Sequence, residues 1–202
     1  MMSGDLDPNL MYRKVPFEWT AEHALADREP VAGISWITSD TDERFVEVVA
    51  RCLAASPDTS DRVAVQSMGS TTAARTLLES APKWQVSREA DWWRLLRYQD
   101  DPIGFVLPVT YDVMVRAGAP LGTIFHTGVT PESRGRGFGR LLLREAVRIL
   151  MGSSVQRIFC DTDETNAPMI HLFESEGWER LPIREVPLPL GFTPGDTSMI
   201  GD

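Results

Sequence analysis

Three glycines and two arginines alternate in the stretch Arg134-Gly135-Arg136-Gly137-Phe138-Gly139, and these residue types suit an anion site. Glycine lets the backbone turn its N–H groups toward an anion where a Cβ would collide. The apolar residues that follow recur at helical spacing, so they predict a helix whose N-terminus adds the positive end of its dipole. The pattern therefore predicts a site for a pyrophosphate, while a sharp surface turn is the alternative.

Two familiar nucleotide motifs do not fit this loop. It lacks the Gly-Lys-Ser/Thr ending of a P-loop, so no lysine is present for a terminal phosphate. A dinucleotide fingerprint would follow the first strand of a repeated βαβ unit, whereas this motif lies in the last third of the chain. A nucleotide-bearing carrier of another kind is the expected ligand.

Two blocks of the sequence resemble a known family. The block 129–140, Val-Thr-Pro-Glu-Ser-Arg-Gly-Arg-Gly-Phe-Gly-Arg, is similar to the acyl-coenzyme A signature of the GNAT superfamily of N-acetyltransferases. The block 166–178 resembles that family's second signature, with Asn166 opening a helix, Phe173 seven positions on, and Gly177-Trp178 at the helix end. Together the blocks cover about residues 121 to 180, in the order and at the separation that the family has.

The resemblance implies acetyl-CoA as acyl donor and co-substrate, with its pyrophosphate at the glycine loop and its pantetheine arm along the preceding strand. The alternative for Thr127–Val129 is an ordinary strand end without a ligand. The alternative for Arg144 and Arg148 is an exposed helix face in contact with solvent. The coenzyme-binding positions implied by the resemblance are Thr127, Gly128, Val129, Arg134, Gly135, Arg136, Gly137, Phe138, Gly139, Arg140, Asn166 and Phe173.

The resemblance also implies catalytic groups. Asp161 ends a predicted strand at a position where some relatives carry a carboxylate that deprotonates the amine, although such a residue is also a common cap or turn former. A main-chain N–H near Val129 is the expected oxyanion donor. His126 has a suitable unperturbed pKa, but alternation turns it away from Thr127, so we expect a packed or surface histidine.

Phe173 departs from the family pattern. Many relatives carry a tyrosine there, whose hydroxyl is thought to protonate the departing thiolate, and Phe173 has no proton to give. It is therefore expected either as a wall beside the pantetheine or as core. Asn166 can cap its helix, which tolerates Pro168 in the first turn, while contacting the coenzyme.

The leading functional hypothesis is an acetyl-CoA-dependent N-acyltransferase that transfers an acetyl group to a small-molecule amine by direct attack in a ternary complex. A catalytically idle acyl-CoA-binding or sensing module is the first alternative, because the tyrosine is missing. A protein N-acetyltransferase that acts on an N-terminus or a lysine is the second.

Charge and composition limit the partners. The chain of 202 residues carries a net charge of −9, yet residues 134–148 hold five arginines against Glu145 alone. The acidic remainder disfavours nucleic acid and suits a cationic or amine substrate. No apolar run approaches the roughly 20 residues of a membrane helix, and the N-terminus lacks the order of a signal peptide, so cytoplasmic residence is expected. The oligomeric state stays open, with a homodimer as one alternative.

No metal site is expected. Cys52 and Cys160 lie far apart in apolar patterns, which favours buried free thiols, and the three histidines are scattered.

Hydrophobic periodicity and turn residues predict a mixed α/β fold, with a mostly antiparallel central sheet flanked by helices. Residues 1–31 are expected to form an N-terminal arm that packs Phe17 and Trp19 on the domain, and residues 32–202 a single GNAT-like domain. Ser39, Asp40 and Thr41 offer caps for the first helix. Strands are expected over 33–38, 92–98, 103–109, 121–129, 156–161 and 183–188, and helices over 45–53, 71–79, 141–150 and after Asn166.

Overall fold

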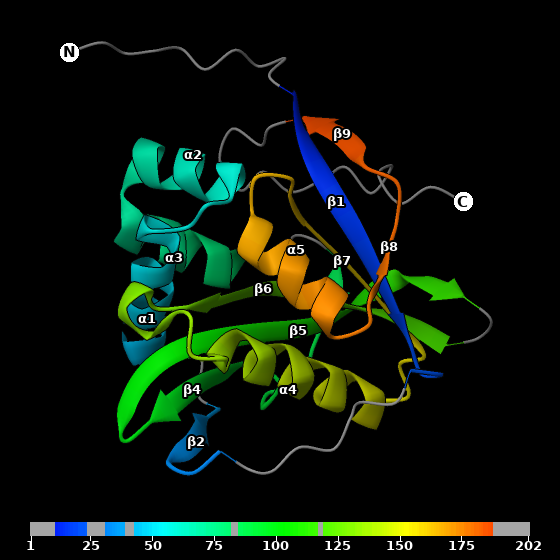
Figure 1. The fold of residues 1–202 in the computed structure, drawn as a ribbon, viewed down its shortest axis with the longest axis horizontal. Coiled ribbons are helices and arrows are strands. Elements are labelled where there is room, and N and C mark those ends of the chain that lie inside the picture. The colour runs from blue at the N-terminus through cyan, green and yellow to red at the C-terminus, as the bar shows by residue number, and fades with distance from the viewer. Residues whose placement is uncertain (1–10, 24–30, 39–42, 82–84, 117–118, 188–202) are drawn as a thin grey trace.

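The computed structural model describes residues 11–23, 31–38, 43–81, 85–116 and 119–187 (Figure 1). The strands are β1 (Met11–Thr20), β2 (Ile34–Ile37), β3 (Val86–Ser87), β4 (Arg94–Tyr98), β5 (Asp101–Arg116), β6 (Ala119–Val129), β7 (Arg157–Asp163), β8 (Glu179–Arg180) and β9 (Arg184–Pro187). The helices are α1 (Glu43–Ala54), α2 (Thr59–Met68), α3 (Ser70–Ser80), α4 (Phe138–Gly152) and α5 (Ala167–Ser175).

The strands form one sheet in the order β2-β4-β5-β6-β7-β1-β8, with β3 added to β5 and β9 added to β1. Within the described sheet, β6 and β7 are the parallel pair, and the other neighbours run antiparallel. The predicted fold class, a mixed and mostly antiparallel sheet flanked by helices, is confirmed.

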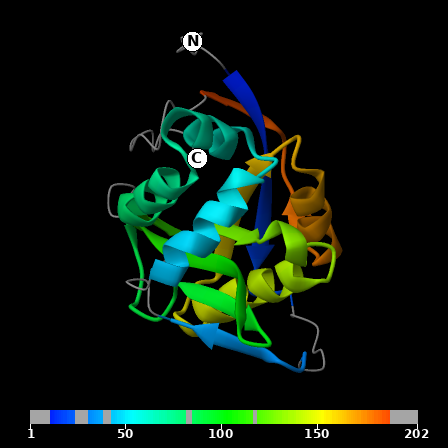
Figure 2. The same ribbon diagram turned by 90° about the vertical axis from the view of Figure 1, so that its left-hand side faces the viewer.

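Helices cover both faces of the sheet. Alternate residues of a strand point to opposite faces, so the contacts of two consecutive residues identify the helix on each face. A Cβ on Gly104 of β5 would lie 3.1 Å from Leu142 of α4. One residue on, Phe105 packs beside Gly128 of β6, where a Cβ would lie 2.9 Å from Cys52 of α1. The α1 side and the α4 side of β5 and β6 are therefore opposite faces, as the two views of the ribbon show (Figures 1 and 2).

β1 lies inside the sheet. It pairs with β7 from Lys14 to Thr20 and with β8 and β9 along its other edge. Phe17 and Trp19 are buried, as the sequence predicted for the arm, but the strand itself was not predicted. The alternation of Val15, Phe17 and Trp19 is typical of a strand, whereas Pro16 argued against an interior one.

The helix α2 was also not predicted. It begins at the N-cap Asp58, whose carboxylate accepts a hydrogen bond from the N–H of Ser60 at 3.0 Å. Its buried residues are few and mixed in polarity, Asp61 among them, so its periodicity is weak. The predicted caps Ser39, Asp40 and Thr41 lie outside the described residues, as does the last residue of the strand predicted over 183–188.

Candidate functional site

The glycine loop has the backbone conformation that its residue types predicted. After β6, a short 3₁₀ helix (Pro131–Ser133) leads into the loop, and α4 begins at Phe138. Gly135 and Gly137 have φ values of 73° and 83°, in the left-handed region that favours glycine, and no heavy atom lies within 4 Å of a Cβ built on either. Because Gly137 is the N-cap and has no side chain, the first N–H groups of α4 are left to a partner from outside the helix.

The arginines around this loop have different partners. The guanidinium of Arg134 donates to the carbonyl oxygens of Val129 at 3.0 Å and Ala55 at 2.9 Å, so it links β6 to the end of α1. Arg140 lies 2.5 Å from the carboxylate of Glu176, which also receives Arg144. Arg134 and Arg140, two of the three arginines that we expected at the phosphates, are thus already paired with groups of the protein.

Arg136 differs from both. It is exposed, and its guanidinium lies 5.0 Å from the ring centroids of Tyr98 and Phe138. An arginine stacked on rings keeps its edge N–H groups for hydrogen bonds. Of the three expected arginines, Arg136 has the contacts that best suit an anion ligand.

β6 and β7 separate beside this loop. They pair at Leu121 with Arg157 and at Gly122 with Ile158, and no further pair of residues joins the two strands as described. Beyond this point, Cys160 Sγ lies 3.4 Å from the N–H of Ile124 and accepts its hydrogen bond. The edge of β6 that faces β7 therefore has no strand partner in the described sheet along Thr127–Val129, where the carbonyl of Val129 accepts from Arg134, and we call this stretch the open edge.

A β-bulge in β6 accompanies this separation. Leu107 of β5 faces His126, whereas Pro108 faces Ile124, so β6 carries one extra residue between them. Proline cannot donate to the ladder, which explains why the register changes at Pro108. On the β5 side, the same stretch of β6 stays paired, with Thr127 facing Val106 and Gly128 facing Phe105.

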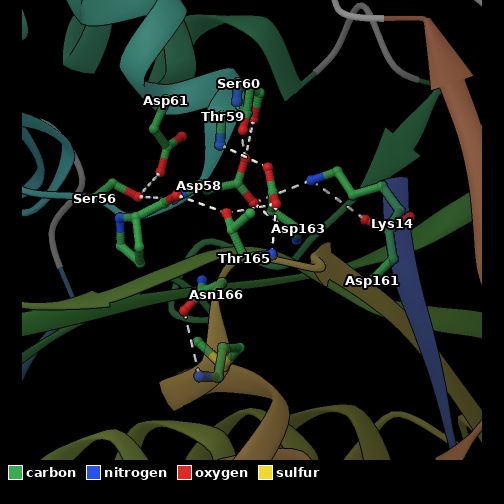
Figure 3. Close-up of polar contacts among 12 residues, drawn as sticks. Lys14, Ser56, Asp58, Thr59, Ser60, Asp61, Asp161, Asp163, Thr165 and Asn166 are labelled. Carbon is green, nitrogen blue, oxygen red and sulfur yellow. Dashed lines mark hydrogen bonds and ion pairs between the residues drawn. The ribbon is translucent and has the colours of Figure 1, made fainter. Parts of the chain in front are cut away.

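The segment between α1 and α2 connects the separated strands. At one end, the carbonyl of Ala55 accepts from Arg134. At the other, Thr59 N–H donates to Asp163 at 2.9 Å, and Asp163 N–H donates to Asp58 at 3.2 Å. Figure 3 shows this network of polar contacts at the end of β7. Residues 55–59 therefore run from the end of β6 to the end of β7.

Asp161, the predicted base, lies between two cationic side chains. Its carboxylate lies 2.6 Å from the guanidinium of Arg184. It also lies 3.7 Å from the ammonium of Lys14 (Figure 3). Burial by itself would lower the pKa of Lys14, but the neighbouring Asp58 and Asp161 carboxylates raise it. Lys14 is therefore a charged partner, and the Asp161 carboxylate is already engaged by Arg184 and Lys14.

His126, which the sequence set aside as packed or surface, is joined to α2. Its Nε2 lies 3.0 Å from a carboxylate oxygen of Asp61, and its ring stacks on Phe105 at a centroid distance of 5.6 Å. Asp61 is 2% exposed and also accepts from Ser56 Oγ at 2.5 Å. Burial lowers the pKa of His126, but the charge and hydrogen bond of Asp61, together with the charge of Asp58, give a net upward shift.

Sequence reasoning missed this pair because α2 itself was not predicted. The one available signal was a polar residue, His126, near the end of an apolar strand that leads into the glycine loop.

In the block 166–178, both Asn166 and Phe173 have a structural role. Asn166 caps α5 by accepting from the N–H of Met169 at 3.3 Å, and Pro168 lies in the first turn, as expected. Phe173 is 3% exposed and stacks on Phe17 of β1 at 4.8 Å, with Trp178 at 4.9 Å. Of the two alternatives for Phe173, these contacts favour core. Contact of either residue with the coenzyme stays a prediction.

Two negative findings concern the described residues. They hold no group of three or more His, Cys, Asp or Glu side chains that could bind a metal ion. Among their helices, none has the length and apolar character needed to cross a membrane.

The chain was compared with known proteins. A family model described as acetyltransferase (GNAT) family matches residues 64–178. Mycothiol acetyltransferase of Thermobispora bispora is 30% identical over 92 residues, which cover 40% of this chain and 31% of that protein. This chain thus matches less than a third of the length of that relative.

Solved structures share the fold. A GCN5-related N-acetyltransferase from Sphaerobacter thermophilus superposes with a TM-score of 0.55 at 20% identity, over 90% of this chain and 53% of that one. A chain of the NatC complex bound to Gag peptide and CoA gives a TM-score of 0.53 at 15% identity, over 74% of this chain and 86% of that one. The family model covers more than half of the residues, and the chain therefore belongs to the acetyltransferase (GNAT) family.

Proposed function

We propose that this protein is an acetyl-CoA-dependent N-acyltransferase that acetylates a small-molecule amine by direct attack in a ternary complex. One observation carries the proposal. The uncapped N-terminus of α4, behind Gly135 and Gly137, adjoins the open edge of β6 at Thr127–Val129. An anion site beside a strand edge that has no strand partner suits a ligand that combines a pyrophosphate with an amide-containing arm.

The residues around this edge fit acetyl-CoA. The N–H groups of Phe138 and Gly139 would bind the pyrophosphate together with Arg136, while Arg134 and Arg140 hold the loop from either side. The open edge of Thr127–Val129 would hydrogen-bond the pantetheine arm as a strand partner does. Acetyl-CoA would supply the acyl group as a thioester, and its thiol is a tolerable leaving group.

The acceptor would approach from the side of α1 and α2. There the segment 55–59 and the end of β7 bring together Asp58, Asp61, Asp161 and Asp163. We propose that Asp161 keeps Arg184 and Lys14 in place, rather than taking the proton as the sequence predicted, because its carboxylate is already paired with both side chains.

A main-chain N–H near Val129 would stabilise the negative charge that develops on the carbonyl oxygen during attack. Phe173 supplies no proton to the thiolate, so this role falls to water or to another group. The missing tyrosine hydroxyl is the reason to test the idle, acyl-CoA-binding alternative as well.

Release of free thiol from acetyl-CoA, measured with a panel of amines, tests the proposal. The panel includes a mycothiol-related amine, because mycothiol acetyltransferases are among the relatives, and peptides with a free N-terminus or lysine. Amine-dependent thiol release with small amines supports the proposal, whereas release with peptides alone would indicate a protein acetyltransferase. Calorimetric binding of acetyl-CoA without turnover across the panel would instead favour a sensor.

A further inference from the structure

His126 occupies a special place on β6. It lies beyond the last pair with β7, directly after the bulge, and one residue before the open edge of Thr127–Val129. Since alternate residues share a face, His126 lies on the side of Gly128, which faces Cys52 of α1. This is the side from which α1 and α2 approach the separated strands.

Asp61 determines which ring nitrogen carries the proton. A buried carboxylate needs hydrogen-bond donors, and Asp61 obtains them from Ser56 Oγ and from His126 Nε2. An ionised carboxylate can only accept, so Nε2 carries a hydrogen. In the neutral ring, Nδ1 then has the free lone pair.

Nδ1 is the unusual atom of this pair. It is buried, and no residue in the described part of the chain gives it a hydrogen-bond partner. Buried polar atoms of proteins have a partner in the great majority of cases. A group that binds at the open edge and brings an N–H would satisfy it, and an amine is such a group.

On these grounds we propose that His126 accepts the proton of the attacking amine at Nδ1, and that Asp61 holds the ring in the required tautomer; this rests on the proposed function. The amine nitrogen forms a bond to the carbonyl carbon, and the carbon–sulfur bond breaks with its electron pair going to the thiolate. The amine proton passes to Nδ1, and the imidazolium then releases it to water. His126 thus does the work that the sequence assigned to Asp161.

The charges around His126 agree with this role. Asp61 of α2 and the more distant Asp58 raise its pKa, while burial and Lys14 of β1 lower it. Cys52 of α1 adds no charge at neutral pH, because burial raises the pKa of its thiol to about 12. The net result is a raised pKa, which brings the ring closer to the operating pH of a general base.

The test compares rates of His126→Gln with wild type across pH, using the amine that gives the fastest thiol release in the panel. The ratio of wild-type to variant kcat cancels the ionisation of the amine itself. It should rise with pH to a plateau of about 10²-fold or more, as expected for loss of a general base. A ratio that is flat or falls with pH would overturn the proposal, because a merely structural histidine would not make the loss of rate grow as the ring loses its proton. His171→Gln, on the exposed face of α5, is the matched control and should change nothing.

A second measurement needs no turnover. The chain has three histidines, so NMR titration of the free protein can assign the His126 signal as the one that neither His23→Gln nor His171→Gln removes. We expect its pKa to lie above the ordinary value of about 6.5 and to fall in Asp61→Asn. A His126 pKa that is unchanged in Asp61→Asn would overturn the pair even if His126→Gln fails to fold. Absence of turnover with every amine would contradict the proposed function instead.

Discussion

The imidazole of His126 in β6 is hydrogen-bonded to the carboxylate of Asp61 in α2 across 3.0 Å, although the two residues lie 65 positions apart in the sequence. The contact ties α2 to the strand beside the glycine loop. It also links the charge of the ring to the stability of the fold, because Asp61 is buried.

The first prediction concerns pH and stability. Asp61 raises the pKa of His126 in the folded protein above its unfolded value of about 6.5. The stabilisation by this pair is therefore fully present below that pH and is lost as the pH rises through the folded pKa. Urea unfolding should show a larger deficit of His126→Gln relative to wild type at pH 5.5 than at pH 8.5. An equal deficit at both values would contradict the raised pKa.

The second prediction concerns Gly137. Replacement by valine should weaken acetyl-CoA binding at least tenfold in calorimetry, because the side chain would occupy the space that the pyrophosphate needs. It should also cost about 1–2 kcal/mol of stability, since the residue has a left-handed φ. Gly177→Val is the matched control, with a φ of 80° and equally open surroundings at the end of α5. Equal acetyl-CoA affinity in both variants would refute the loop as the phosphate site.

The third prediction separates two arginines of the loop. Arg136→Ala should weaken acetyl-CoA binding by about tenfold, and less at high salt, because an exposed charged hydrogen bond is screened by ions. Arg134→Lys keeps the charge but loses the fork that joins Val129 to Ala55. It should lower the melting temperature more than Arg136→Ala does. The reverse pattern would mean that Arg134 is the phosphate ligand.

The fourth prediction concerns Asp161→Asn. Arg184 and the buried Lys14 would each lose an anionic partner, so the melting temperature should fall. The ratio of wild-type to variant kcat should stay below tenfold and should not change with pH. A drop of about 10²-fold that depends on pH would restore Asp161 as the base that the sequence predicted.

The fifth prediction concerns Phe173→Tyr. The ring of Phe173 is buried against Phe17 and Trp178, so the added hydroxyl would be removed from water, and a buried hydroxyl without a hydrogen-bond partner costs about 1–3 kcal/mol. Thermal melting should show this loss, and the rate should not rise. Phe17→Tyr, in the partner ring, is the control for destabilisation alone. A faster rate without loss of stability would show that the hydroxyl reaches the departing thiolate.

Much of the fold could be predicted, because each long element has a clear local pattern. The strand before the glycine loop, the helix after it and the helix that Asn166 opens all occur where expected. The strand β1 was not predicted, since Pro16 concealed an alternation that only pairing with β7 makes stable. The helix α2 was not predicted because its buried face is small and mixed.

The sequence by itself determined the conformation of the glycine loop and the cap of α5. A left-handed φ at Gly137 and a side-chain cap at Asn166 depend on residue type and on neighbours within a few positions. The resemblance to the GNAT family rests on these same local features, and it is confirmed.

Only the tertiary structure decided the partners of the charged groups. Arg134 reaches a carbonyl 79 positions away, Asp161 an arginine 23 positions away, and His126 a carboxylate 65 positions away. Such contacts depend on strand order and register, which bring distant segments together in ways that no local pattern encodes. For this reason the sequence indicated where the coenzyme would bind, whereas the proposed proton acceptor emerged only once α2 was packed against β6.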